Sequence, residues 1–407
     1  MAVLVAALVG CSERERANPF DPRNGSTHGS PIGFAALAGD ARVDLKWQDV
    51  HEPGLLGYDL LRRAPGDSDF TLLVAGLPPN ASAYADRGLQ NGLDHSYRLF
   101  YVFDRGRGGR PAEETATPGP ARPWVADAGQ AIVVRLTPDG RHVAFVRAGF
   151  QQPVSVAVDS VSGQVWVADG LAGTLTAFDP SSGVRSNLPG FVAPGALAVS
   201  AVDHSAWLCD EQAGKVHHFS ATLMPILNPI EPLGTPIGIA LDPWDGSVWI
   251  CERGANRVRR YTVSHTFLWS VSVYRPSRVA VDSLTRSGWM TSFEAGRVVR
   301  VAPTGVAEDT IAGFAGPIGI AVDPRRGRIW IADARAGAVV AVDRAGSQIT
   351  RVTGLPEVRD VAVELESGDV WAAVPGMGQV VQLSPTGQIL RRLGGFSAPY
   401  SVDVTSH

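Results

Sequence analysis

The sequence has few cysteines, few charges and no long apolar run, and each shortage excludes a class of protein. Its three cysteines, Cys11, Cys209 and Cys251, are too few and too scattered for a disulfide framework. Charged residues make up 19% of the 407 residues, the formal net charge is −4, and no block of Lys or Arg occurs, so no nucleic-acid partner is expected. No apolar run reaches the roughly 18 residues that a membrane-spanning helix needs.

Signatures of catalysis and metal binding are also missing. The sequence contains no Gly-x-Ser-x-Gly, His-Glu-x-x-His or phosphate-loop motif. The histidines of the C-terminal part share no common position from which they could converge on a metal: His142, His204, His217, His218 and His265. The sequence therefore predicts no catalytic residue, no metal site and no cofactor.

What the sequence does have is glycine and proline, 45 and 29 residues respectively, and many short apolar stretches. No sustained period of 3.6 residues indicates helices. Short strands separated by Gly- and Pro-rich turns are typical of an all-β protein.

The N-terminus has the pattern of a secretory segment. Residues 1–10 are apolar and end in small residues, and Leu8-Val9-Gly10-Cys11 resembles the bacterial lipobox. The resemblance implies a signal segment over 1–11, diacylglycerol on the Cys11 thiol and a lipid-anchored protein of the bacterial cell envelope. Because Ser12 follows, it also implies the outer membrane, facing the periplasm or the cell surface. A frayed apolar terminus is the alternative, and no Lys or Arg precedes the run.

Residues 12–31 are polar and rich in Pro and Gly, which predicts a disordered tether. Residues 32–116 then contain four strand-like runs separated by turn clusters, typical of a β-sandwich: 43–47, 58–63, 70–74 and 97–103. This region resembles a fibronectin type III domain, with Trp47 and Tyr58 at the positions of that family's strand-B tryptophan and strand-C tyrosine. Leu93, four residues before Tyr97, resembles its tyrosine corner. His51 and His95 are isolated here and are expected at the surface. A Pro-rich linker is expected over 117–123.

Internal repetition dominates residues 124–407. Tryptophans stand at 124, 166, 207, 249, 289, 330 and 371, with gaps of 42, 41, 42, 40, 41 and 41 residues. The unit at 317–355 divides into four strand-like stretches, and four short antiparallel strands in about 41 residues are the signature of a propeller blade.

The motif Pro-x-Gly-Ile-Ala-Val-Asp…Trp-x-Ala-Asp resembles the NHL repeat family, most clearly at 236–242 and 317–323. The same frame occurs in streptogramin-lyase-like and gluconolactonase-like propellers, so the resemblance implies the fold and leaves activity open. The first tryptophan lacks a preceding Pro-containing stretch, and residues 398–404 supply one with no tryptophan after it. We therefore expect the C-terminal strand to complete the first of seven blades and close the ring.

Acidic residues end the second strand of five units: Asp127, Asp169, Asp210, Glu252 and Asp333. The favoured interpretation is an Asx-type turn with the backbone amides that follow. The alternative is an acidic rim that binds a cation or a basic ligand, and Ser292 and Val374 interrupt that rim. The aspartates at the ends of the first strands are expected to form hairpin turns: Asp159, Asp242, Asp282, Asp323 and Asp403.

Basic residues gather in two adjacent units, with Arg257, Arg275 and Arg278 the candidates for contacts with an anionic partner. Arg253, Arg259, Arg260 and Arg297 lie near them in the sequence, and Arg359 lies two units on. A solvated surface is the alternative. Cys209 and Cys251 occupy equivalent positions of neighbouring units, too far apart for a disulfide, and are expected to be buried free thiols.

We therefore predict a monomeric binding or scaffolding protein rather than an enzyme, whose propeller loops recognise a protein, peptide or glycan. The alternatives are a propeller enzyme, a lyase or hydrolase with a metal-dependent site at the axis, and a purely structural envelope component.

Overall fold

The computed structural model describes residues 18–405, which fold into two compact units. The first unit extends to Pro120 and includes Thr137–Asp139, and the second contains Ala121–Leu136 and the chain from Gly140 onward. Both units are built from β-strands, as predicted, and one 3-10 turn, η1 (Pro375–Met377), is the helical element among these residues. No helix in residues 18–405 is long and apolar enough to cross a membrane. The lipidation site predicted at Cys11 lies outside the described residues.

The first unit contains two antiparallel sheets that share one core. The smaller has the order β1-β2-β5, formed by β1 (Ala35–Gly39), β2 (Arg42–Lys46) and β5 (Ala83–Arg87). The larger has the order β4-β3-β6-β7, formed by β4 (Thr71–Leu77), β3 (Gly57–Arg63), β6 (His95–Phe103) and β7 (Gly106–Ala116). Trp47, Tyr58 and Tyr97 are buried in the common core. The Tyr97 hydroxyl donates to the Asp86 carboxylate at 3.0 Å, and Leu93 is exposed.

Two features of this unit differ from the prediction. Residues 18–31, expected to belong to a disordered tether, form hydrogen-bonded turns, and the ring of Phe20 packs edge-on against Tyr101 at 4.7 Å between centroids. His95 was expected at the surface but is 4% exposed, because it starts a strand that is paired on both sides, by β3 and by β7. Burial lowers the pKa of His95.

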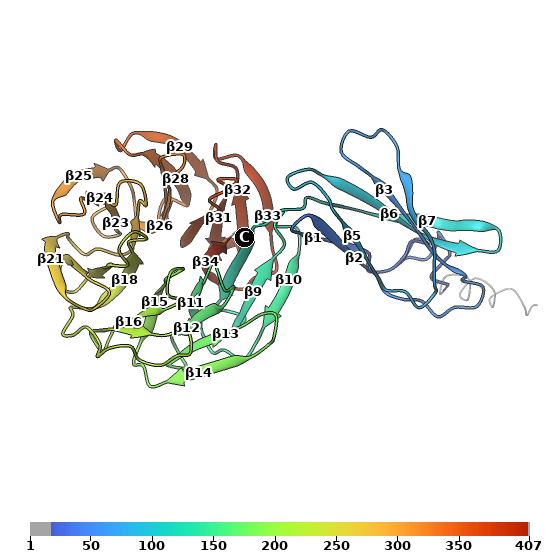
Figure 1. Ribbon diagram of the computed structural model, residues 1–407. Coiled ribbons are helices and arrows are strands. Elements are labelled where there is room, and N and C mark those ends of the chain that lie inside the picture. The colour runs from blue at the N-terminus through green and yellow to red at the C-terminus, as the bar shows by residue number, and fades with distance from the viewer. Residues whose placement is uncertain (1–17, 406–407) are drawn as a thin grey trace, which may run out of the picture. The chain divides into compact units, whose positions relative to one another are not determined.

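The second unit is a β-propeller, a ring of small antiparallel sheets around one axis (Figure 1). Strands such as β11, β15, β18 and β34 lie innermost, and β14, β21, β25 and β29 lie at the periphery.

The sheets follow the chain in order, each running from its innermost strand outward. They are β34 (Pro399–Thr405), β8 (Arg122–Asp127), β9 (Ile132–Leu136), β10 (Val143–Arg147); β11 (Pro153–Val158), β12 (Val165–Asp169), β13 (Thr174–Phe178), β14 (Arg185–Pro189); β15 (Pro194–Val199), β16 (Ala206–Asp210), β17 (Lys215–Phe219); β18 (Pro236–Leu241), β19 (Val248–Glu252), β20 (Arg257–Tyr261), β21 (Phe267–Ser272); β22 (Val279–Val281), β23 (Gly288–Ser292), β24 (Arg297–Val301), β25 (Ala307–Ala312); β26 (Pro317–Asp323), β27 (Arg328–Asp333), β28 (Ala338–Asp343), β29 (Gln348–Thr353); and β30 (Asp360–Val363), β31 (Val370–Val374), β32 (Gln379–Leu383), β33 (Ile389–Leu393).

The third sheet departs from the expected four strands. After β17 the chain makes only two isolated bridges to it, Val216 with Ile230 and Phe219 with Pro225. Pro225, Pro229 and Pro232 lie in this segment, and proline cannot donate to a strand ladder. The repeat therefore continues here without a regular outer strand.

The repeated tryptophans hold neighbouring sheets together. All seven have no more than 2% of their surface exposed, and each packs into the apolar cluster of the sheet that follows. Trp330, for example, packs with Val361 and Val381 of the next sheet. Trp371 of the last sheet packs with Val125 and Val134 of the first, so the series of contacts returns to its start.

The C-terminal strand pairs with the first propeller strand, as expected. Val402 faces Val125 and Thr405 faces Arg122 in an antiparallel ladder. The backbone amides of Ser397 and Ala398 also donate to Asp127, at 2.9 and 2.8 Å. The two ends of the repeat region are thus joined by hydrogen bonds.

We predict that deletion of residues 396–407 will lower the melting temperature of the propeller by roughly 10 °C or more. The deletion exposes the edge of β8 and the Trp371 cluster and leaves Asp127 without two of its donors. Calorimetry of the full chain would measure the change. A chain lacking only residues 406 and 407 is the control, and an unchanged melting temperature in the long deletion would contradict the closing role of β34.

Candidate functional site

The propeller axis carries two cavities, one at each end of the innermost strands. The cavity at the start of these strands has a volume of ≈ 1130 Å³ and is called the loop-face pocket here; it is lined by residues that include Arg253, Arg278 and Arg359. The cavity toward their ends has a volume of ≈ 500 Å³ and is lined mainly by small apolar residues. Arg278 lines both cavities, so its side chain lies between them.

Small side chains dominate the innermost strands because these strands approach one another at the axis. The residue paired with the repeated tryptophan is alanine in six sheets: Ala157, Ala198, Ala240, Ala280, Ala321 and Ala362. Two residues earlier, Gly238 and Gly319 leave no room for a Cβ atom, which would lie 2.6 and 2.7 Å from the backbone of the neighbouring strand. The equivalent positions of β30 and of the chain before β22 are charged, Asp360 and Arg278.

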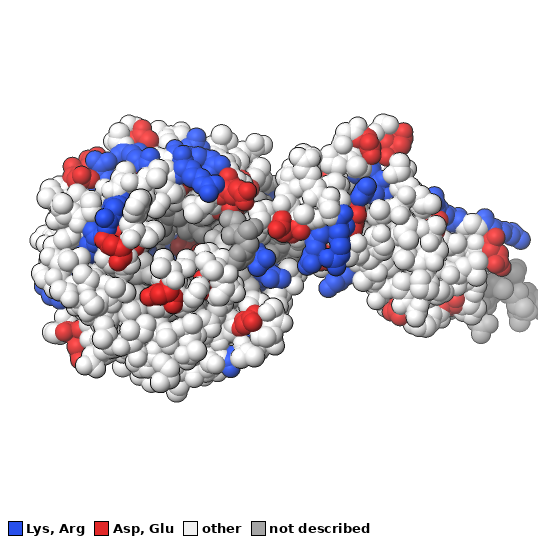
Figure 2. Space-filling model, viewed as in Figure 1, with Lys and Arg blue, Asp and Glu red and all other residues white. Residues whose placement is uncertain are grey.

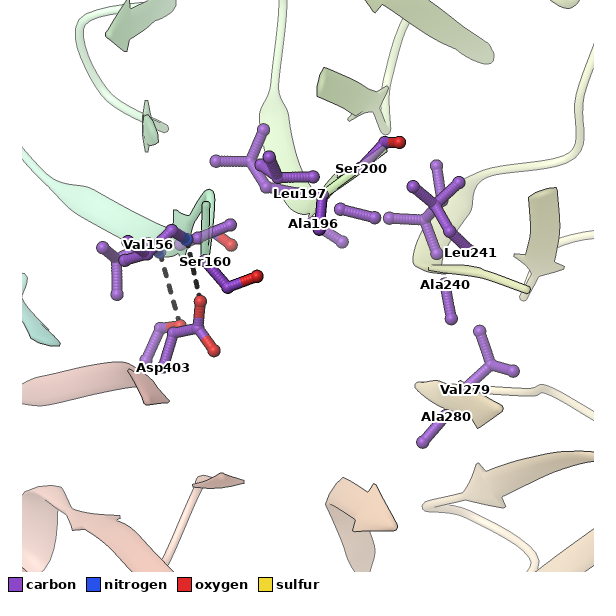
Figure 3. Close-up of a pocket in the computed structure, with 18 of the residues that line it drawn as sticks. Val156, Ser160, Ala196, Leu197, Ser200, Ala240, Leu241, Val279, Ala280 and Asp403 are labelled. Atoms are coloured by element: carbon purple, nitrogen blue, oxygen red, sulfur yellow. Dashed lines mark hydrogen bonds between the residues drawn. The ribbon is translucent and has the colours of Figure 1, made fainter. Parts of the chain in front are cut away.

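Asp403 occupies the alanine position in the first sheet, since it pairs with Trp124. The expectation that Asp403 forms a hairpin turn is wrong. In β34 the position equivalent to the turn aspartates is Thr405, two residues after Asp403. Asp159, Asp242, Asp282 and Asp323 do accept bonds from the turns that follow them. Asp403 instead accepts a hydrogen bond from the Val158 amide at 2.8 Å, across to the next sheet (Figure 3).

The pKa of Asp403 is raised to about 6, mainly by burial and also by the nearby carboxylate of Asp360, while the hydrogen bonds from the Val158 and Val404 amides oppose the rise. Figure 3 shows Asp403 beside Val156 and Ser160, with the alanines of other sheets across the cavity. Burial also raises the pKa of Asp360, while Arg278 opposes the rise. The axis therefore contains two carboxyl groups that favour the protonated form more than exposed aspartates do.

The five acidic residues at the ends of the second strands are no more than 2% exposed. Their carboxylates accept hydrogen bonds from the backbone amides of the loop that precedes the same sheet. For example, Asp210 binds the amides of Val192 and Ala193 at 3.0 and 2.8 Å, and Asp333 binds that of Gly316 at 2.7 Å. Asp127 and Asp169 bind following amides as well, as an Asx-type turn requires. With their oxygens used in this way, Asp127, Asp169, Asp210, Glu252 and Asp333 form no accessible acidic rim.

The three arginines named from the sequence have different environments. Arg257 makes two hydrogen bonds to the buried Glu252 at 2.9 and 3.0 Å, and Arg275 pairs with Glu294 at 3.2 Å. Arg278 donates to the backbone carbonyl of Ile237 and reaches the loop-face pocket. On the propeller face seen in Figure 2, basic and acidic side chains are interspersed. Only Arg278 of the three therefore belongs to the axial site.

Two repeat positions supply most of the loop-face pocket. The residue directly after the second strand contributes Glu211, Arg253, Phe293, Ala334 and Pro375. The second residue of the first-strand stretch contributes Ile237, Ser277, Ile318, Arg359 and Tyr400. At Ile237, Ile318 and Tyr400 the strand register shifts, and such β-bulges re-aim a side chain. A comparison of these two positions across all the repeats could have predicted from the sequence that Glu211, Phe293 and Tyr400 line the pocket.

Solved structures similar to this chain include propeller proteins at low sequence identity. Virginiamycin B lyase from Staphylococcus aureus matches with 19% identity and a TM-score of 0.53, over 60% of this chain and 84% of the lyase. A catalytically inactive variant of that lyase with quinupristin matches with 18% identity and a TM-score of 0.53, over 67% of this chain and 88% of the lyase. A functionally unknown protein from Desulfotomaculum acetoxidans matches with 13% identity and a TM-score of 0.61, over 70% of this chain and 99% of that protein.

These likenesses show the fold and nothing about activity. No family model and no curated protein matches the sequence. Within residues 18–405 no group of three or more His, Cys, Asp or Glu side chains is placed to hold a metal ion. His218 instead stacks on Trp207 with 3.8 Å between ring centroids, and burial lowers its pKa to about 4. Cys209 and Cys251 are buried and free, as predicted.

We predict that Asp403→Asn will change how stability depends on pH. Because the folded pKa of Asp403 lies above that of an unfolded chain, its contribution is fully present below about pH 4 and is lost as the pH rises through about 6. The variant should equal the native protein near pH 4 and exceed it by on the order of 1 kcal/mol at pH 7.5. Guanidinium unfolding at four pH values would measure this. Asp309→Asn on the outer strand β25 is the control, and a difference that does not vary with pH would contradict the assignment.

Proposed function

We propose that this chain is a lipid-anchored binding or scaffolding protein of the bacterial cell envelope. In this proposal Cys11 carries the lipid, a fibronectin type III-like sandwich follows it in the chain, and a seven-bladed β-propeller closed by β34 presents the ligand site. The ligand is a protein, peptide or glycan.

The loop-face pocket is the observation that carries the binding function. Its volume of ≈ 1130 Å³ exceeds the roughly 300–1,000 Å³ of small-molecule sites and suits a segment of a larger ligand. Charged, aromatic and aliphatic side chains line it together, among them Arg359, Tyr400 and Ile318. The scaffold beneath is fixed by buried tryptophans and by carboxylates bound to loop amides, which favours binding on a preorganised surface.

A propeller enzyme is the second candidate, because the fold is that of virginiamycin B lyase. Glu211 favours this candidate most, since it lines the pocket and burial raises its pKa, while Arg278, Arg253 and Arg359 oppose the rise. A carboxyl group of raised pKa in a cleft is a common general acid or base. Incubation with quinupristin, followed by mass spectrometry and metal analysis of the protein, would distinguish the two candidates.

We predict that Ala334→Trp will reduce ligand capture at least tenfold, because an indole at this half-buried position fills the loop-face pocket. Ligand would be captured from envelope extracts with the immobilised full chain and quantified by mass spectrometry. Ala345→Trp, at an exposed turn between β28 and β29, is the matched control. Equal capture by both variants, with equal melting temperatures, would place the ligand elsewhere.

We predict that Cys11→Ala will move the protein from the membrane fraction to the soluble fraction and abolish labelling by radioactive palmitate. The lipid chains supply the membrane affinity, and the thiol is their attachment atom. Ser12→Ala should leave both readouts unchanged. Membrane association of the unlabelled Cys11 variant would show that another part of the protein holds it there.

A further inference from the structure

Four guanidinium groups meet in the loop-face pocket without a carboxylate partner. They come from different parts of the ring and line one cavity: Arg253, Arg278, Arg335 and Arg359. Elsewhere in the propeller many arginines are bound to buried acids, as Arg260 is to Asp242 at 2.7 Å and Arg344 is to Asp282. Among the residues that the structure describes, none of the four pocket arginines forms such an ion pair. The pocket therefore has guanidinium groups that are not held in ion pairs with carboxylates.

Arg359 is the most constrained of the four. Its Nε atom is buried and has no hydrogen-bond partner, while a terminal nitrogen donates to the Tyr400 hydroxyl. Burial lowers the pKa of Arg359, and the like charge of Arg278 lowers it further. Because an unsatisfied buried donor is costly, an incoming oxyanion would be stabilised at this position.

The aromatic side chains of the pocket each stack against an arginine. The Arg359 guanidinium lies over the Tyr400 ring at 3.5 Å from its centroid, and the Arg335 guanidinium lies over Phe293 at 4.3 Å. Sugars would need such ring faces to be open for stacking. The covered rings favour a ligand recognised through its charge.

The acidic side chains of the lining restrict the charge of the ligand group. Glu211, Glu294 and Glu357 face the same cavity as the four arginines, and Glu294 also binds Arg275. Four positive and three negative groups leave a small excess of positive charge, which suits singly charged carboxylates better than a doubly charged phosphate. Ile237, Ile318 and Pro356 add apolar surface between the charges.

We propose that the loop-face pocket binds an acidic peptide segment, with its carboxylates held by Arg253, Arg278, Arg335 and Arg359. This inference rests on the proposed binding function and names the chemical class of its ligand. Guanidinium groups match carboxylates with two parallel hydrogen bonds, and the apolar lining accommodates the side chains between the acids.

The test uses fluorescence anisotropy of the full chain with a labelled peptide of alternating Glu and Ala, and with its Gln counterpart. The acidic peptide is expected to bind at least tenfold more tightly than the Gln peptide. Arg253→Gln and Arg335→Gln are each expected to weaken it about tenfold, since hydrogen bonds to charged groups contribute this much. Arg325→Gln, in the exposed turn between β26 and β27, removes the same charge outside the pocket and should change binding less than twofold.

Several outcomes would overturn the proposal. Equal binding of the Gln peptide, or an equal loss in Arg325→Gln, would show that the charges of the pocket do not select the ligand. Preference for an oligogalacturonate over the acidic peptide would identify a glycan ligand instead, and preference for inorganic phosphate would identify a phosphate site. If the Gln peptide binds equally well but Ala334→Trp abolishes that binding, the peptide class is wrong and the binding function remains. If no probe binds and envelope extracts yield no ligand, the binding function fails as well.

Discussion

The ladder between β34 and β8 is the constraint on which the propeller depends. Each sheet of the ring buries its tryptophan on the next sheet, so the contacts form a closed series only if the last sheet meets the first. Trp371 reaches Val125 and Val134 of a sheet whose innermost strand, β34, comes from the other end of the chain. The same strand bonds to Asp127 through the amides that precede it. The first sheet, which joins β34 to β8, therefore combines strand hydrogen bonds, apolar packing against Trp371 and capping of the preceding loop by Asp127.

Closure also determines what the axis can hold. Inner strands that converge must carry small residues, and a Cβ atom at Gly238 or Gly319 would collide with the neighbouring backbone. Within this narrow lining, Arg278 and Asp360 stand at positions that are small in other sheets, and Asp403 replaces an alanine. Apart from Arg278, the large side chains at the axis line the cavity at the start of the inner strands. The wide cavity lies at the end of the inner strands that carries the β-bulges, and Ile237, Ile318 and Tyr400 line it.

The sequence predicted those parts of the fold that repeat. Evenly spaced tryptophans and the unpaired stretch at 398–404 were sufficient to predict the propeller and the partner of β8, because both follow from a pattern that recurs along the chain.

Departures from the repeat pattern were not predicted. The alignment of Asp403 with the turn aspartates was two residues off, since Pro399 is equivalent to Pro236 and the turn position counted from it falls on Thr405. The prolines of 225–232 were not taken as a sign that the third sheet lacks its outer strand, and Phe20 was too isolated in a polar stretch to indicate packing. Of the candidate site residues, Arg278 lies at the axis, whereas Arg257 is bound to Glu252.

The pocket is chemically independent of the scaffold that presents it. The second-strand acids hold the loops through backbone amides. The residue that follows each second strand adds only its backbone amide to this capping, as Glu211 does at 2.9 Å from the Ala193 carbonyl, so its side chain can differ from sheet to sheet. The bulge positions behave likewise, because their side chains are directed away from the ladder. A ring built this way can share its fold with a lyase and carry a different set of groups at its axis. Function in this chain therefore has to be derived from the unpaired guanidinium groups around Arg359, since the fold alone is compatible with both binding and catalysis.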